Sequence, residues 1–244
     1  MTPLSILLFV GVFIVSVHGG LLPTYITACK VHSPGFKECA IKNGNAAIPS
    51  LSNGDKRLGI PTFNPLLVPF IEFSSGSFKL NGTDVVVSGL PKITINDMKV
   101  DTGKKKFHLN VTCPEIVLDL NYNIGGKIAS LPLEGHGKGK VVFYEPIIIY
   151  DFDYAEYDKN GNKHLDLKKD HLDVFPTKLS LQLNNLFNGN KALGESTNKL
   201  LNENWPEVLD EFRPAINEIV GAIIRSVLVP LSKKVPLNEI FTDY

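Results

Sequence analysis

The chain has 244 residues, with 25 Lys and Arg, 25 Asp and Glu, and a formal net charge of zero. Without a basic excess, net charge gives the chain no affinity for nucleic acid or other polyanions, so nucleic-acid-binding functions of that kind are excluded. Hydrophobic residues make up 43% of the sequence, and a chain of this size buries about 70% of its unfolded surface, so a large core is feasible.

Residues 1–19 have the pattern of a secretory signal peptide. An uncharged apolar run at 4–17 leads into Val17-His18-Gly19, which fits the −3 and −1 positions of a cleavage site. The run is shorter than the roughly 20 apolar residues of a membrane span, so a retained anchor is the weaker alternative. The sequence therefore predicts a secreted, extracellular protein with one domain at 20–244 and no stable membrane insertion.

Three cysteines follow. Cys29 and Cys39 lie close together near the start of the predicted mature chain, and in an oxidising compartment we expect them to form a disulfide. Cys113 falls on an apolar strand phase, which predicts a buried free thiol. Because no histidine cluster accompanies the cysteines, no metal site is predicted.

The segment at 21–42 is predicted to be a short helical or irregular entry closed by this disulfide. The next stretch, 44–70, is rich in Gly and Pro. Pro61, Pro65 and Pro69 disfavour a long helix there and favour extended or turn structure.

From Ile71 to Leu186 the pattern is that of β-strands. The clearest alternation runs from Ile116 to Ile124, where every second residue is apolar and the residues between are mainly polar. Residues 107–113 alternate in the same way, and Pro114-Glu115 shifts the phase by one, as a bulge would. Further strands are predicted at 84–90, 92–100, 139–157, 163–174 and 178–184.

Turn signals separate these strands. Asn160-Gly161 is a hairpin signal, and Gly125-Gly126 is predicted to be another turn. Consecutive strands joined by short turns favour an antiparallel sheet of long, curved strands. The sequons at Asn81 and Asn110 are predicted glycosylation sites on the outer surface, and Asn110 falls on the polar strand phase.

One long helical pattern occupies the C-terminal tail. Asn204 is the predicted N-cap, with Glu207 as its capping-box partner. Apolar residues then recur at three- and four-residue spacing through Val227. A kink or break is predicted at Pro214, and Pro230 is predicted to end the helix.

This helix is unusually apolar. Between Ile219 and Leu231 the only polar side chains are Arg225 and Ser226. A helix that is apolar on most sides must be enclosed by another element. The β segment is available for that role, which indicates a container instead of a catalytic cleft.

Motifs of common catalytic sites are missing from the sequence. There is no G-x-S-x-G elbow, Walker loop or H-E-x-x-H. The glycine-rich run at 135–139 lacks the ending of a phosphate loop, and Asp158, Asn160 and Asn162 lack the Gly and Glu positions of a calcium loop. No catalytic residue, cofactor or metal is therefore predicted, although a triad assembled in space leaves no such motif.

Several segments occur in an order that is characteristic when they are taken together. They are Cys29 with Cys39, the block LGIPTFNPLLVPF at 58–70, Ser88-Gly89-Leu90, GHGKG at 135–139, the run at 183–216 and VPLNEIF at 235–241. In these segments the chain resembles the takeout/juvenile hormone-binding protein family, secreted insect carriers of small lipophilic molecules. The second disulfide of some hormone-binding members has no counterpart here, which favours the takeout-like branch.

The resemblance implies an α+β fold with a long C-terminal helix wrapped by a strongly curved antiparallel sheet, related to the TULIP lipid-transfer architecture. An apolar tunnel between helix and sheet would bind a juvenile hormone-like terpenoid, a fatty acid or a related lipid. The family is also associated with circadian output, feeding and chemosensation. A monomer is expected, and a protein receptor is left open.

Two alternatives remain at this stage. One is a secreted interaction or signalling protein with a solid core and no bound ligand, and the other is a lipid-modifying enzyme with a Ser or His facing a cavity. Core packing and tunnel lining select the same residues, so the sequence does not separate them. Tyr122 and Tyr144 are candidates for orienting a polar ligand head. The predicted ligand-binding residues are Phe63, Leu66, Val68, Phe107, Leu109, Val111, Ile116, Leu118, Leu120, Tyr122, Trp205, Leu209, Phe212, Ile216 and Val220.

Overall fold

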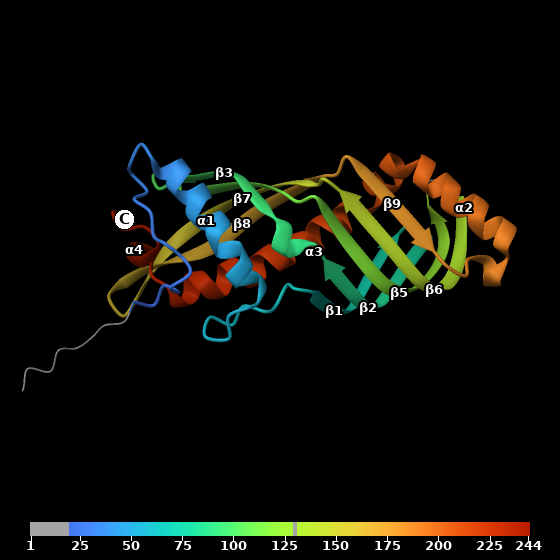
Figure 1. The fold of residues 1–244 in the computed structure, drawn as a ribbon, viewed down its shortest axis with the longest axis horizontal. Helices are drawn as coiled ribbons and strands as arrows, with labels where there is room; N and C mark the ends of the chain where they lie inside the picture. Colours follow the sequence, from blue (N-terminus) through green and yellow to red (C-terminus); the bar gives the residue numbers. More distant parts are fainter. Residues whose placement is uncertain (1–19, 129–130) are drawn as a thin grey trace, which may run out of the picture.

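The computed structural model describes residues 20–128 and 131–244, so the predicted signal peptide at 1–19 lies outside the described residues. The molecule is elongated, with two antiparallel sheets end to end and one long helix running past both (Figure 1). Its α-helices are α1 (Phe36–Ser52), α2 (Lys191–Glu203), α3 (Trp205–Lys234) and α4 (Leu237–Ile240), and two short 3-10 turns are η1 (Leu90–Lys92) and η2 (Phe187–Gly189).

The two sheets have the strand orders β1-β2-β5-β6-β9 and β3-β4-β7-β8, and all paired strands are antiparallel. The α+β fold with strongly curved antiparallel sheets and a long C-terminal helix is therefore as predicted. The strands are β1 (Leu66–Ser75), β2 (Phe78–Ser88), β3 (Thr94–Asp101), β4 (Lys106–Thr112), β5 (Glu115–Ile128), β6 (Leu131–Tyr144), β7 (Ile147–Lys159), β8 (Asn162–Phe175) and β9 (Lys178–Leu183).

Long extended segments of the chain run from one sheet directly into the other. We call the junction between the two sheets the waist. The chain passes from one sheet to the other at 113–114, 145–146 and 176–177, and each of these dipeptides contains a proline. Proline cannot donate to a strand ladder, so it ends regular pairing at each crossing. The phase shift at Pro114-Glu115 is therefore a change of sheet, and the predicted bulge there was wrong.

Backbone hydrogen bonds tie these crossings together. The Cys113 N–H donates to the Pro146 carbonyl (3.3 Å), and the Glu145 N–H donates to the Pro114 carbonyl (2.9 Å). A further crossing, from β2 toward β3, is made by Gly89, which has a φ of 100°. A Cβ atom on Gly89 would lie 2.2 Å from the Glu115 carbonyl oxygen, so only glycine fits this close approach.

Turns and strand ends were predicted with mixed success. The hairpin at Asn160-Gly161 is confirmed, with φ values of 53° and 79° between β7 and β8. The strand predicted at 139–157 is divided into β6 and β7 by the waist. Gly125-Gly126 is not a turn, because both residues continue β5 and pair with β6.

The N-terminal region is more helical than predicted. Helix α1 continues to Ser52, into the Gly- and Pro-rich stretch at 44–70, and includes Pro49. The predicted disulfide between Cys29 and Cys39 is present, and Cys113 is a buried free thiol as predicted. The C-terminal residues pack on this disulfide-closed segment, where the Thr242 N–H donates to the Cys29 carbonyl (3.1 Å).

Helix α3 is continuous, so a break at Pro214, the end at Pro230 and the side-chain cap at Asn204 were wrong predictions. Pro214 causes no break, and it lies on the exposed side of the helix, where water can hydrate the freed carbonyl. Pro230 does not end the helix. The helix ends instead before Pro236, which favours extended backbone at Val235. The Asn204 side chain does not cap α3, because its amide donates to the Leu200 carbonyl of α2 (2.8 Å).

Helices cover three of the four sheet edges. On β3, the Asn45 side chain of α1 accepts from the Ile95 N–H (2.8 Å) and donates to the Ile95 carbonyl (3.0 Å), as a neighbouring strand would. On β8, α3 runs alongside, and Arg213 donates to the Val174 carbonyl (3.1 Å). These contacts satisfy edge groups that would otherwise be open to pairing with another chain.

Helix α2 lies along the edge of β9 (Figure 1), and two of its asparagines bond to that edge. Asn198 accepts from the Leu183 N–H (2.8 Å) and donates to its carbonyl (2.9 Å). Asn202 does the same with Leu181, at 2.9 and 2.7 Å. This pairing gives a physical role to the asparagine-rich run at 183–216.

Replacing Asn198 and Asn202 with alanine should destabilise the fold by about 1–2 kcal/mol each, because each change leaves a β9 N–H and carbonyl without partners. Urea unfolding with a common m-value would measure the loss. Asn204→Ala is the matched control, since that amide bonds a carbonyl of the preceding helix alone. A loss no larger than that of the control would contradict the strand-mimic role.

Candidate functional site

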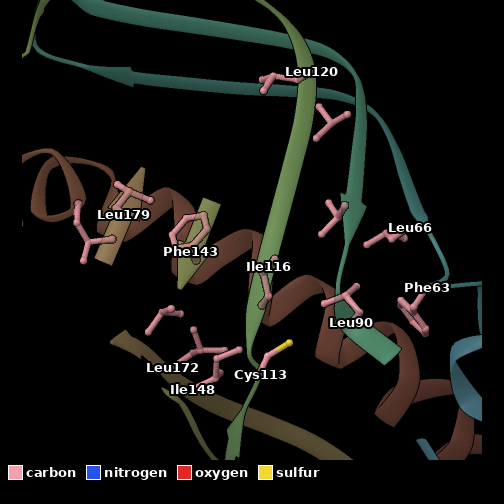
Figure 2. Close-up of a cluster of buried hydrophobic side chains, with 14 of the residues drawn as sticks. Phe63, Leu66, Leu90, Cys113, Ile116, Leu120, Phe143, Ile148, Leu172 and Leu179 are labelled. Carbon is pink, nitrogen blue, oxygen red and sulfur yellow. The ribbon is translucent and has the colours of Figure 1, made fainter. Parts of the chain in front are cut away.

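One apolar cluster extends through both sheets and α3. Figure 2 shows Ile116 and Phe143 of the five-stranded sheet and Ile148 and Leu172 of the four-stranded sheet lying around the helix. All of the residues predicted to bind ligand belong to this cluster. The residues chosen from strand and helix periodicity, and the three chosen from the block at 58–70, therefore all pack in or against one apolar cluster.

In strand β5, buried and exposed side chains alternate as the sequence predicts. Ile116, Leu120 and Tyr122 are buried, whereas Leu118 is half-buried. The residues between them at 119, 121 and 123 are exposed. Side chains alternate across a strand, so a single face of β5 lines the interior.

The remaining predicted residues come from four other parts of the fold. Phe63, in the segment before β1, and Leu66 of β1 are buried, and Val68 of β1 is half-buried. Strand β4 contributes Phe107, Leu109 and Val111. From α3 come Trp205, Leu209, Phe212, Ile216 and Val220, of which Leu209 is buried and the others are half-buried.

An aromatic group at the end of the five-stranded sheet was not predicted. Phe73 of β1 and Phe78 of β2 contact Phe212 of α3, with ring centroids 4.8 and 5.5 Å apart. Such pairs add about 0.5–1.5 kcal/mol to the free energy of burial. They fix the first half of α3 against this sheet.

A second aromatic group lines the four-stranded sheet. Tyr150, Phe152 and Tyr154 alternate along β7 and are all buried. Phe107 stacks on Phe152 with centroids 4.8 Å apart. The period-2 spacing of the β7 aromatics was visible in the sequence and could have identified them.

The two tyrosines predicted to orient a ligand differ in position. The Tyr122 hydroxyl is internal and donates to the Asn184 carbonyl (2.6 Å), and burial raises its pKa to about 12. Tyr144 is exposed, with the Lys178 ammonium 5.8 Å from its ring centroid. The prediction for Tyr144 was wrong, because the strand phase directs Phe143 inward and its neighbour outward.

A polar group joins α3 to the four-stranded sheet. Asp170 of β8 accepts from the Arg225 guanidinium (2.6 Å) and from the fully buried Tyr150 hydroxyl (2.7 Å). Burial opposes the charge of Asp170, but these two hydrogen bonds prevail and lower its pKa. Burial and Asp170 together raise the pKa of Tyr150. The one arginine in the most apolar part of the helix therefore holds α3 to β8.

Helix α3 is apolar but incompletely buried. Over its most apolar 18 residues the mean hydropathy is 1.5, which by length and composition would suffice for a membrane span, yet only 11% of that window is buried. A close-packed interior would bury most large apolar side chains. A cavity of about 320 Å³ that is partly open to solvent lies between α3 and the β7–β8 hairpin, and its lining mixes the apolar Leu165, Leu167 and Val229 with the polar Asp166, Ser232 and Lys233.

A polar cluster occupies the far end of the four-stranded sheet. Glu156 accepts from the Lys105 ammonium and the Tyr244 hydroxyl, and Lys163 lies 3.0 Å away. The Lys105 ammonium, then the Tyr244 hydroxyl, lower the pKa of Glu156 from 4.5 to about 2. No group of three His, Cys, Asp or Glu side chains suited to a metal ion occurs within 20–128 and 131–244.

This cluster gives an expected pH dependence. A carboxylate with a depressed pKa stabilises the fold above its ordinary value of 4.5, and that stabilisation is lost as pH falls toward 2. Glu156→Gln should therefore remove about 1–2 kcal/mol at neutral pH and flatten the fall in stability between pH 4.5 and 2. Unfolding measured across that range would show it, while Glu134→Gln, at an exposed position of β6, should keep the wild-type slope. An unchanged slope in the Glu156 variant would contradict the assignment.

Comparison with known proteins agrees with this architecture. Residues 6–242 match the family model described as haemolymph juvenile hormone binding protein. The crystal structure of Takeout 1 from Epiphyas postvittana superimposes with a TM-score of 0.80 at 25% identity, covering 88% of this chain and 99% of that one.

Two curated proteins are also similar in sequence. The circadian clock-controlled protein daywake of Drosophila melanogaster is 24% identical over 90% of this chain and 88% of its own length. A putative beta-carotene-binding protein of Schistocerca gregaria is 23% identical over 78% of each chain.

Proposed function

The chain belongs to the haemolymph juvenile hormone binding protein family, whose members bind small lipophilic ligands, and we propose that it is a secreted carrier holding such a ligand between α3 and the two sheets. The ligand class in this proposal is a juvenile hormone-like terpenoid, a fatty acid or a related lipid. The name of the family and the name of one relative support a terpenoid ligand, because juvenile hormone and β-carotene are both isoprenoids.

The observation that carries the proposal is the partial burial of α3. Its apolar stripe faces apolar strand phases of both sheets, yet most of its large side chains remain half-buried. Apolar surface that faces the sheets but is incompletely packed is what an apolar ligand would cover. The cavity between α3 and the β7–β8 hairpin adds to this surface.

The expected affinity follows from the burial of the ligand. A chain of about 15 carbons gains on the order of 12 kcal/mol when it leaves water. Association costs of about 4–15 kcal/mol offset much of that gain. A dissociation constant between nanomolar and micromolar is therefore expected.

The proposal assigns binding and release, without a catalytic step, cofactor or metal. It treats 20–244 as one monomeric domain in the extracellular space without stable membrane insertion. A protein receptor for the loaded carrier stays open. No residue is assigned a catalytic role.

The decisive experiment is native mass spectrometry of the protein secreted from insect cells, followed by organic extraction. A stoichiometric lipid is expected, and its identity would narrow the ligand class. Trp205, at the start of α3, supplies a second readout, because its fluorescence should change when juvenile hormone or a long-chain fatty acid is added. An empty protein with no Trp205 response would favour an interaction protein without a ligand.

A further inference from the structure

Strand β1 forms the fourth sheet edge. Among the described residues it pairs with β2 on one side, and no other strand pairs with its other side. Leu66 and Val68 before Pro69 and Phe73 after it join the apolar cluster, because the side-chain phase of the strand changes at Pro69. The outward face of β1 is also apolar, with Leu67 65% exposed and Phe70 52% exposed. An exposed apolar edge strand is a template for association with other chains, so it needs cover.

The register of β1 and β2 places a glycosylation sequon beside this surface. Phe70 pairs with Thr83, and Glu72 pairs with Asn81, so these four side chains share the outward face. Asn81 is therefore diagonal to Phe70, a separation of about 7–8 Å between the backbones. The first sugar of a glycan on Asn81 would reach the Phe70 ring from that position.

Packing inside the protein requires glycine at the middle position of the sequon, Gly82. A Cβ atom on Gly82 would lie 2.7 Å from the Ile71 side chain and 3.0 Å from the Leu120 side chain. Gly82 therefore faces inward, while Asn81 and Thr83 are both exposed. The two residues that a glycosyltransferase reads lie on the solvent side.

We propose that Asn81 carries an N-linked glycan whose core sugars lie over Phe70 and Leu67 and cover the free edge of the five-stranded sheet. A C–N bond forms between Asn81 Nδ2 and C1 of the first N-acetylglucosamine. The sugar–phosphate bond of a lipid-linked oligosaccharide donor breaks, the lipid pyrophosphate leaves, and the amide loses one proton. The proposal rests on the secretion proposed above, since this donor belongs to the secretory pathway.

The second sequon provides an internal comparison. Asn110 lies on β4, where its Oδ1 accepts from the Asn96 side-chain amide (3.3 Å). Thr112 of the same sequon also accepts from Asn96 (3.1 Å). On β7 the residues paired with Asn110 and Thr112 are Ile149 and Ile147, and neither is aromatic, so a glycan there has no ring on the paired strand to cover.

The first test is the intact mass of the secreted protein before and after treatment with an N-glycan amidase. Asn81→Gln and Thr83→Ala should each remove one glycan, whereas Thr83→Ser keeps the sequon and the glycan. A secreted wild-type protein with a bare Asn81 would overturn the inference without touching the carrier proposal. A protein that is never secreted would overturn the secretion proposal as well.

The second test asks whether the glycan contacts Phe70. Removing the glycan should raise the unfolding equilibrium constant about two- to five-fold, as for loss of a cross-strand aromatic pair. In Phe70→Ser the same removal should have no effect. Asn81→Gln should also self-associate in sedimentation experiments, and Asn110→Gln should not. An equal effect of the glycan in wild type and Phe70→Ser, or equal association of both sequon variants, would refute the proposed contact.

Discussion

Gly89→Ala should destabilise the protein by about 3–5 kcal/mol, enough to unfold many domains. Two costs add together. The φ of 100° is strained for any residue with a side chain, and the new Cβ atom would lie 2.2 Å from the Glu115 carbonyl oxygen. The close contact cannot relax easily, because Glu115 begins β5 at the waist and its backbone is held there. Denaturant unfolding of the purified variant would measure the loss.

Gly59→Ala separates the two costs. Gly59 also has a positive φ, 83°, but a Cβ atom there would meet nothing within 4 Å. The Gly59→Ala variant should lose only about 1–2 kcal/mol of unfolding free energy, which is the cost of holding a residue with a side chain at positive φ. If both variants lost the same amount, the close approach at the waist would carry no energy and the role given to Ser88-Gly89-Leu90 would be wrong.

Val220→Trp should weaken ligand binding at least about 100-fold, which corresponds to about 2.7 kcal/mol. Val220 is half-buried on the apolar stripe of α3, so an indole at this position would occupy the space proposed for the ligand. Displacement of a fluorescent fatty acid would measure the change. On the carrier proposal the added ring fills the space of the ligand, so the free energy of unfolding should stay close to that of the wild type.

Ala222→Trp is the matched control. Ala222 lies two residues along, on the exposed side of α3, and the same substitution there should leave affinity unchanged. A solid core would give a different result, since Val220→Trp would then overpack the interior and cost about 1–3 kcal/mol. Such a loss of unfolding free energy, in a protein that binds no measurable ligand, would favour an interaction protein with a solid core.

The strand phases illustrate what could be predicted locally. The alternation from Ile116 to Ile124 identified the inward face of β5, and the spacing from Trp205 to Val220 identified the inward stripe of α3. Side-chain direction repeats every two residues in a strand and every 3.6 in a helix, so a short window records which side is apolar. The hairpin at Asn160-Gly161 is equally local, because those residue types favour positive φ.

The waist illustrates what could not. Pro114 and Pro146 interrupt β pairing, but their sequence context does not say whether the chain makes a bulge, a turn or a change of sheet. The β6–β7 crossing lies about 30 residues from the β4–β5 crossing, and only their backbone hydrogen bonds show that they form one junction. Pro214 was misjudged for a related reason, since its tolerance depends on which side of α3 faces water.

The sequence by itself determined the class of most elements, the buried face of β5 and of α3, the disulfide and the family to which the chain belongs, because residue types at characteristic spacing carry this information. Only the tertiary structure decided which partners meet. Asn198 and Asn202 replace a strand on β9, Arg225 meets Asp170, and the Asn81 sequon lies beside Phe70. These contacts join residues whose separation along the chain ranges from about ten to more than fifty. Such pairings arise from how whole elements pack, and no local pattern of residues encodes them.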